Sequence, residues 1–291
     1  MNINDLKYFH QLAIQKNFSR VADYFGVRQP TITMAVKRLE KQYGLPLILR
    51  DKSHQALELT GFGRQFDRHA EIILRELDLA EKEARHTKLE RVRFGLPPII
   101  GNYYFPALVP NLLKCHLLAR LQIIETGSNE TLKLVNKGDV DMALLGSLEE
   151  PNQVGLAAST IATSPFGILV SKKSPLAAAY SEGVYFSELK RQKFIGLNER
   201  FIHNQAFHQV AARAHVRPKV IYRTADVHVL GSLVAEGIGV AFLTALAANI
   251  NPGAVLLPLL DDRQPLFYIS KVRRSQTLLE GYQKELWDQL G

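Results

Sequence analysis

Apolar residues recur at helical spacing near the start of the chain, and this pattern predicts three short helices. We expect the first over residues 2–16, the second over residues 18–24 and the third from Pro30 onward. A proline is tolerated in a first helical turn, because its missing N–H would have no partner within the helix. Gly26 lies between the last two helices, at a turn that favours a residue tolerant of positive φ. The pattern therefore predicts a helix-turn-helix.

The third predicted helix has one apolar side and one polar side. The apolar side consists of Ile32, Ala35, Val36 and Leu39. The polar side carries Gln, Thr, Lys and Arg, whose donors and acceptors suit base edges and phosphates. Residues 46–60 are predicted to form two short strands around a polar turn, which adds a wing. The residues expected to contact DNA are Ser19, Arg20, Arg28, Gln29, Pro30, Thr31, Thr33, Met34, Lys37, Arg38, Arg50, Lys52, Ser53 and His54.

Residues 60–89 are predicted to form one long helix with a narrow apolar seam. The seam residues follow one another at steps of four and three, which is the spacing of a coiled coil. They are Phe66, Ala70, Ile73, Leu77, Ala80 and Ala84. A helix packed against its own domain is the alternative. The other faces are charged, however, and therefore favour pairing with a second copy.

From residue 91 the pattern changes to alternating strands and helices, and the strand-helix order over residues 91–145 predicts a parallel sheet with right-handed crossovers. Strands are expected at residues 91–96, 121–125, 141–145, 166–170, 193–197, 219–223, 239–243, 256–260 and 266–272, and a helix over residues 102–118. We expect an α/β domain with two lobes, of the periplasmic-binding-protein type. Lobe 1 covers about residues 90–162 and 265–291, and lobe 2 covers about residues 163–264. The domains are then a winged helix-turn-helix at 1–60, a linker helix at 61–89 and the two-lobed domain at 90–291.

Ligands of open α/β sheets bind beyond the carboxyl ends of the strands, where helix N-termini favour anions. We therefore expect a small carboxylate effector between the lobes, whose binding closes the cleft. Arg200 and His203 are candidates to supply positive charge. Helix capping is an equal alternative for Ser128 and Asn102, and His203 is more often a surface histidine. The predicted effector residues are Pro97, Pro98, Ile99, Ile100, Gly101, Asn102, Thr126, Gly127, Ser128, Asn198, Arg200, Phe201, His203, Thr224, Ala225 and Asp226.

The charge of the chain supports an anionic partner. The 291 residues carry a formal net charge of +8. Residues 1–60 hold 9 Lys and Arg against 5 Asp and Glu, so half of the net charge lies in about a fifth of the chain. This placement coincides with the predicted helix-turn-helix and therefore favours DNA as the partner.

Other compositional features indicate a cytoplasmic protein. No apolar run reaches the roughly 18 residues of a membrane span, and the N-terminus lacks the pattern of a signal peptide. The single cysteine, Cys115, has no internal partner for a disulfide, which fits a reducing compartment. Such a cysteine is more often a half-buried bystander than a reactive sensor. We expect neither a metal nor a cofactor, since His54 has no second ligand at metal-binding spacing.

Several short motifs together resemble the LysR-type transcriptional regulators. They are Phe18-Ser19, Val21-Ala22, Val27-Arg28-Gln29-Pro30, Lys37-Arg38-Leu39-Glu40, Gly44, Leu47-Ile48-Leu49-Arg50, Leu59-Thr60 and Gly63. The resemblance implies a regulator that binds operator DNA and dimerises through the linker helix, commonly as a tetramer, with RNA polymerase as a further partner. Arg28 stands where the family usually has Ser, and Met34 where it often has Arg. These two departures affect which operator is read.

Three further runs resemble the regulators of malolactic fermentation in lactic acid bacteria, a subgroup of that family. They are residues 29–41, 95–103 and 144–149. The second run contains Pro98-Ile99-Ile100, which matches the effector loop of the family. The resemblance implies L-malate as effector and malate-conversion genes as targets.

Two other classes of protein compete with a regulator. An enzyme is disfavoured, because the chain has no phosphate-binding Gly loop, no paired metal motif and no nucleophile elbow. A solute-binding protein for uptake has similar lobes but no DNA-binding domain. Either alternative would retain operator DNA no better than random DNA, which separates them from a regulator.

Overall fold

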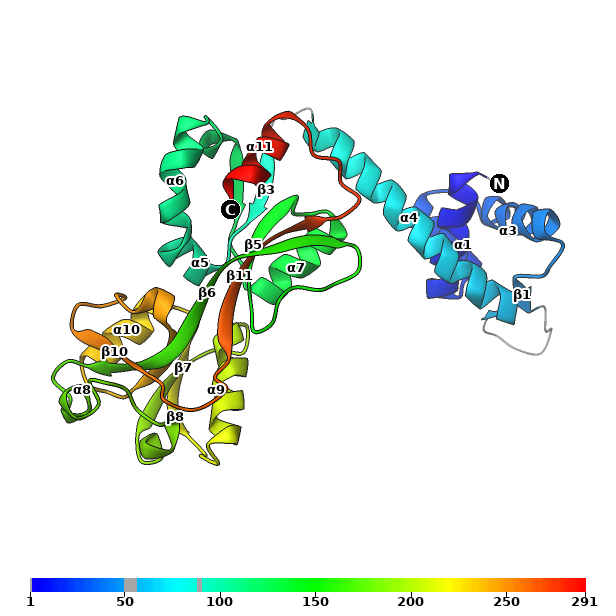
Figure 1. The fold of residues 1–291 in the computed structure, drawn as a ribbon. Helices are drawn as coiled ribbons and strands as arrows, with labels where there is room; N and C mark the ends of the chain where they lie inside the picture. Colours follow the sequence, from blue (N-terminus) through cyan, green and yellow to red (C-terminus); the bar gives the residue numbers. More distant parts are fainter. Residues whose placement is uncertain (1, 50–56, 88–90) are drawn as a thin grey trace. The chain divides into compact units, whose positions relative to one another are not determined.

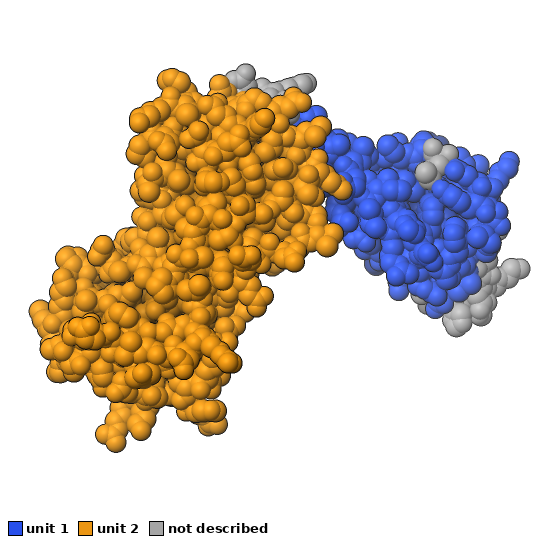
Figure 2. Space-filling model, viewed as in Figure 1, with its two compact units in different colours: residues 1–85 blue, residues 86–291 orange. Residues whose placement is uncertain are grey.

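A computed structural model of the chain describes residues 2–49, 57–87 and 91–291. The chain divides into two compact units, residues 1–85 and residues 86–291 (Figure 2). The first unit contains the predicted helix-turn-helix, and the second contains the predicted two-lobed domain.

The first unit is a three-helix core with a two-stranded wing, as the sequence predicts. Its elements are α1 (Ile3–Gln15), α2 (Phe18–Phe25), α3 (Gln29–Tyr43), β1 (Ile48–Leu49), β2 (Glu58–Leu59) and α4 (Gly61–Thr87). Asn2 caps α1 through its side chain, and Gly26 ends α2 at φ +64°, in the left-handed region that glycine favours. Arg28 begins α3 without a side-chain cap, in agreement with the absence of Ser at that position.

The helix α4 contributes its first half to the core of the first unit. Phe66 and Ala70 are buried there together with Phe9 and Leu39. Ile73, in contrast, is 47% exposed. The predicted seam therefore has two parts: its first residues pack within their own unit, whereas Ile73, Ala80 and Ala84 are exposed and Leu77 is half-buried.

The second unit contains a mixed sheet and a smaller parallel sheet. In chain order its strands are β3 (Val92–Gly95), β4 (Leu121–Ile124), β5 (Met142–Ser147), β6 (Leu156–Ser171), β7 (Lys193–Leu197), β8 (Lys219–Thr224), β9 (Ala241–Thr244), β10 (Ala254–Pro258) and β11 (Leu266–Arg274). Its α-helices are α5 (Pro98–Tyr103), α6 (Phe105–Lys114), α7 (Ser128–Lys137), α8 (Pro175–Ala179), α9 (Ile202–Arg213), α10 (Val227–Ala235) and α11 (Gly281–Gln289). Short 3-10 turns lie at η1 (Leu118–Arg120), η2 (Phe186–Leu189) and η3 (Ala245–Ala247).

The two lobes share two long strands, β6 and β11, which pair antiparallel along their length (Figure 1). The larger sheet has the order β10-β6-β11-β5-β3-β4, and β9 also pairs with β6. The β3–β4 and β3–β5 pairs are parallel, as the strand-helix order of residues 91–145 predicts, and the other pairs of this sheet are antiparallel. The second lobe has the parallel pair β7–β8. The first half of β6 lies outside the single predicted strand at residues 166–170.

In place of the single helix predicted over residues 102–118, the structure has two helices, and the first of them begins before residue 102. The first helix, α5, starts at Pro98, and α6 follows after an interruption at Tyr104. Pro106 accounts for the interruption, because it has no N–H to donate to the carbonyl of Asn102 and its ring would clash with that carbonyl in a continuous helix. Asn102 therefore lies within α5 and caps no helix.

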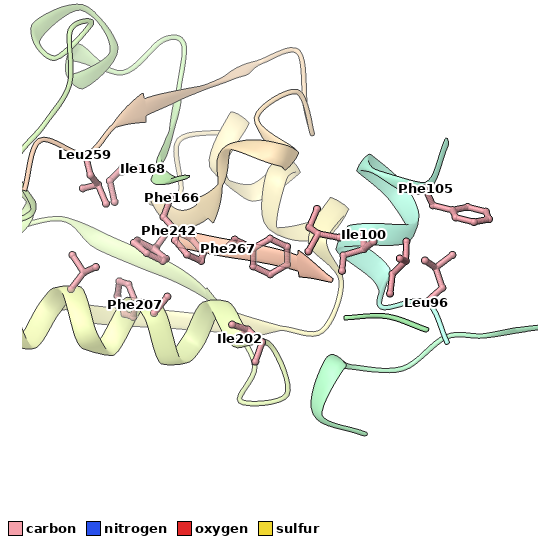
Figure 3. Close-up of a cluster of buried hydrophobic side chains, with 14 of the residues drawn as sticks. Leu96, Ile100, Phe105, Phe166, Ile168, Ile202, Phe207, Phe242, Leu259 and Phe267 are labelled. Carbon is pink, nitrogen blue, oxygen red and sulfur yellow. The ribbon is translucent and has the colours of Figure 1, made fainter. Parts of the chain in front are cut away.

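The core of the second unit runs through both lobes. It includes Leu96, Ile100 and Phe105 of the first lobe and Ile202 and Phe207 of the second (Figure 3). The lobes are thus joined by apolar packing as well as by strands. No helix in the described ranges is both long enough and apolar enough to cross a membrane.

Candidate functional site

The exposed side of α3 carries most of the residues predicted to read DNA. Arg28, Gln29, Pro30, Thr31, Met34, Lys37 and Arg38 are exposed, while Thr33 is half-buried. The opposite side of the helix is buried in the core. Because the apolar side is fixed in the core, the polar side presents its donors and acceptors outward as one surface. Ser19 and Arg20 of α2 are exposed too.

Arg38 has a structural partner that its sequence position did not indicate. Its guanidinium donates to Asp5, which is 1% exposed, at 2.5 Å from Nη2 to Oδ1 and 3.3 Å from Nε to Oδ2. Burial raises the pKa of Asp5, but the hydrogen bonds and charge of Arg38 and the Asn2 backbone lower it overall. Arg38 therefore ties α3 to α1, besides any contact with phosphate. The wing residues Arg50, Lys52, Ser53 and His54 lie outside the described residues.

In the second unit, many of the predicted effector residues surround one cavity between the lobes. The cavity is lined by Pro97, Pro98, Ile99, Ile100, Gly127, Ser128, Arg200, Phe201, Ile202, His203 and Phe267. Its volume is about 20 Å³, which is close to the room that one water molecule needs. A Cβ on Gly127 would lie 3.0 Å from the carbonyl oxygen of Arg200, so the lobes already touch. An effector of several heavy atoms is larger than this cavity.

Ser128 takes a place in the cavity wall and not the capping role that was its alternative. Gly127 is the N-cap of α7, and Ser128 follows as its first residue. The Ser128 hydroxyl oxygen accepts the N–H of Gly146 at 2.9 Å, in a buried position. Since the oxygen is the acceptor in that bond, its own hydrogen remains available to donate to a ligand.

His203 is neither a surface residue nor a source of positive charge. It is 3% exposed, and burial lowers its pKa to about 3, so the imidazole is neutral at physiological pH. Its ring packs against Phe166 and Phe267 at centroid distances of 5.3 and 5.2 Å. Arg200 remains an exposed cation beside the cavity.

The remaining predicted effector residues do not line this cavity, and several have other partners. Asp226 caps α10 by accepting the N–H groups of His228 and Val229 at 2.8 and 3.3 Å. Asn102 Nδ2 lies 3.5 Å from His228 Nε2. The other predicted residues outside the lining are Gly101, Thr126, Asn198, Thr224 and Ala225.

Sequence reasoning missed two lining residues and a neighbouring groove. Ile202 and Phe267 are apolar and lie in a helix and a strand, so they gave no signal of ligand binding. The groove has a volume of about 560 Å³, within the range of small-molecule sites. It is lined by polar residues of both lobes, among them Asn129, Gln205 and Gln209, and it shares Ser128 and Ile202 with the cavity.

Two other candidate chemistries receive no support. Cys115 is half-buried, and burial together with Glu285 raises the pKa of its thiol, which disfavours the reactive thiolate. Among the residues that the structure describes, no cluster of His, Cys, Asp and Glu has the arrangement of a metal site.

A winged helix-turn-helix followed by a long helix and a two-lobed α/β domain defines a ligand-responsive, DNA-binding transcription regulator. Residues 3–64 match the bacterial regulatory helix-turn-helix protein of the lysR family, and residues 86–291 match the LysR substrate binding domain. The chain therefore belongs to the LysR family of transcriptional regulators. The family comprises regulators of transcription, not enzymes.

Two similar proteins span almost the whole chain, and a third matches about two thirds of it. The malolactic fermentation system transcriptional activator of Lactococcus lactis is 30% identical over 98% of this chain and 96% of its own length. The full-length regulator CbnR in complex with its target DNA has a TM-score of 0.57, with 18% identity over 100% of this chain and 98% of its own. The effector binding domain of QuiR in complex with shikimate has a TM-score of 0.59, with 13% identity over 68% of this chain and 94% of its own. These two structures share the fold.

Proposed function

We propose that this LysR-type regulator binds operator DNA through α3 and responds to a small carboxylate, L-malate, that enters the cleft between its lobes. The observation that carries the DNA-binding part is the exposed polar side of α3 above its buried apolar side. Gln29, Thr31, Thr33 and Lys37 are assigned to base edges. Other cations of the first unit are assigned to phosphates, so binding is expected to weaken as salt increases.

We further propose that two or more copies act together, paired through the exposed part of α4. This helix has 27 residues and is therefore about 40 Å long, close to one turn of DNA. Ile73 and Leu77 supply apolar surface on its outward part. Paired helices would separate two copies of α3 by a distance that suits a site with two half-sites. The proposed compartment is the cytoplasm, where the chromosome lies, and RNA polymerase is a proposed further partner at the promoter.

The choice of effector rests on the cavity and on one relative. The starts of α7 and α9 meet at the cavity, and within the described chain neither has a side-chain cap. Uncapped helix N-termini favour anions, and Arg200 adds a positive charge beside them. The Lactococcus lactis relative is named for malolactic fermentation, which supports L-malate as the effector and malate-conversion genes as targets.

Regulation would follow from the tightness of the cleft. Since the cavity holds about 20 Å³, the effector has to shift the lobes, and this shift would change how copies of the chain pack. Couplings of this kind are typically about 1–3 kcal/mol, a 5- to 150-fold change in affinity. We therefore expect L-malate to alter operator affinity within that range.

The DNA-binding proposal is tested with two glutamines at opposite ends of α3. Gln29 lies at the N-terminal end, which contacts bases in helix-turn-helix proteins, and the exposed Gln42 lies near the C-terminal end. An operator is first selected from random DNA with the full-length protein. Gln29→Ala should weaken operator binding by about 1–3 kcal/mol and leave random-DNA binding nearly unchanged. Gln42→Ala is the matched control and should change neither.

Two outcomes would contradict the proposal. Equal losses on operator and random DNA would remove Gln29 from base reading. Failure of the unaltered protein to prefer any DNA sequence would favour a solute-binding protein or an enzyme over a regulator. The effector proposal has its own test, in which Ser128→Ala should weaken L-malate binding in calorimetry without changing effector-free operator binding.

A further inference from the structure

The buried imidazole of His203 has an unused hydrogen-bonding atom. Its Nε2 is buried and, within the part of the chain that the structure describes, has no hydrogen-bond partner. A buried polar atom without a partner is unfavourable, and native proteins rarely keep one without a reason. His203 also lines the cavity between the lobes, so a ligand there could supply the missing partner.

The surroundings of His203 are apolar on most sides. Phe166 and Phe267 pack against the ring, and Ile100 and Ile202 contribute to the same cavity. His203 also lines a second small hollow, whose lining includes Arg223. The Arg223 guanidinium already donates to the Leu197 carbonyl at 3.1 Å and to Asn204 Oδ1 at 2.7 Å.

Groups that favour anions line the same cavity. Gly127 and Ser128 belong to the start of α7, Phe201 and Ile202 to the start of α9, and Arg200 is exposed beside them. The cavity lining thus combines apolar side chains around a neutral imidazole with groups that favour anions. A carboxylate against the neutral imidazole and the phenyl rings would lose its hydration without gaining a counterion, which is strongly unfavourable. A neutral hydroxyl there would gain a hydrogen bond.

We propose that His203 determines ligand specificity, because its Nε2 hydrogen-bonds the hydroxyl of a hydroxy-carboxylate whose carboxylate lies toward Arg200 and the starts of α7 and α9. The proposal rests on the proposed function of the cleft as an effector site. A neutral imidazole nitrogen either donates or accepts, and a hydroxyl does both, so either tautomer can form the bond. A carboxylate of the same size without the hydroxyl would leave Nε2 unpartnered.

The experiment compares L-malate with succinate, which lacks the hydroxyl, by titration calorimetry of the full-length protein. The unaltered protein should bind L-malate about 5- to 150-fold more tightly than succinate, the range for leaving one buried polar group unpaired. His203→Phe keeps an aromatic ring among Phe166 and Phe267 but removes the polar atom, so the preference should fall to about one. His203→Gln keeps a hydrogen-bonding group and should retain part of the preference. His208→Gln, at an exposed position of the same helix, is the control and should retain all of it.

The ratio of the affinities for L-malate and succinate separates a change of specificity from damage to the fold, because damage would weaken the binding of both ligands alike. Equal affinities in the unaltered protein, or an unchanged preference in His203→Phe, would overturn the role of His203 and leave the carboxylate effector in place. Binding of neither ligand by the unaltered protein would overturn the proposed effector, and the specificity proposal with it.

Discussion

The ion pair between Arg93 and Asp141 is expected to stabilise the first lobe, which carries residues 97–100 of the cavity wall. Arg93 lies in β3, and Asp141 directly precedes β5. Asp141 accepts two guanidinium hydrogen bonds, at 2.6 Å from Nη2 and 3.2 Å from Nε, and the backbone N–H of Arg93 at 2.8 Å. The side chains are only 8% and 11% exposed. The strand β3 leads into Pro97 of the cavity wall, and Gly146 within β5 donates to Ser128 of that wall, so the pair also supports the cavity.

Asp141→Ala should lower the free energy of unfolding of the second unit by about 3–5 kcal/mol. Removal of one partner from a buried ion pair costs this much, because the other charge remains buried without a counterion. For a unit of this size the melting temperature should fall by about 6–20 °C. Glu130 and Lys133 provide a contrast, because their side chains are 53% and 66% exposed. Glu130→Ala should cost about 0.2–0.5 kcal/mol.

The sole tryptophan makes the measurement specific to the right unit. Trp287 lies in α11 of the second unit, and its carbonyl accepts the ammonium of Lys271 in β11 at 3.0 Å. Urea unfolding of the full-length protein, followed by its fluorescence, therefore reports on this unit without interference from the DNA-binding unit.

A double variant tests the electrostatic reasoning itself. Arg93→Met with Asp141→Asn removes both charges but keeps an amide oxygen for the Arg93 backbone N–H. It should therefore recover at least half of the loss caused by Asp141→Ala. The reasoning is refuted if Asp141→Ala costs no more than Glu130→Ala, or if the double variant is less stable than Asp141→Ala.

Three further predictions concern the first unit, the cleft and the long helix. Because the pKa of Asp5 beside Arg38 is lowered in the folded protein, the carboxylate contributes stability above about pH 4, and this contribution is lost as the pH falls through the pKa of the folded state. Asp5→Asn should therefore make the free energy of unfolding less dependent on pH in the acid range. An unaltered acid limb would contradict this. Gly127→Ala should lower the free energy of unfolding by about 1–3 kcal/mol, because the new methyl group would press on the Arg200 carbonyl. An unchanged free energy of unfolding in urea would exclude that contact. Ile73→Asp should raise the dissociation constant for self-association, measured by sedimentation, at least about tenfold. The same dissociation constant in the variant and the unaltered protein would show that Ile73 lies outside the interface.

The local elements of the first unit follow directly from the sequence. The apolar spacing of Ile32, Ala35, Val36 and Leu39 matches helix periodicity, so it predicts both α3 and its buried side. Gly26 could be assigned to a turn because its φ of +64° is a conformation that few other residues adopt easily. Helix periodicity and turn glycines depend on only a few neighbouring residues, which explains why they can be recognised without a structure.

The site between the lobes could be predicted in part. Pro97 to Ile100, Gly127, Ser128 and Arg200 were predicted because they lie at strand-to-helix turns, and they line one cavity. Thr224 to Asp226 occupy an equivalent turn but lie outside it, since sheet order and the path of β6 and β11 decide which turns meet.

The protonation state of His203 and the partner of Arg38 could only come from the tertiary structure. His203 is desolvated by residues distant in sequence, including Phe166 and Phe267, and that environment lowers its pKa. Arg38 meets Asp5 because α1 and α3 pack together, although 33 positions separate the two residues. Sequence by itself thus determined the helices and turns of the first unit and the family, because these depend on local periodicity and motifs. Burial, charge state and the size of the cavity depend on long-range packing, and only the folded chain decided them.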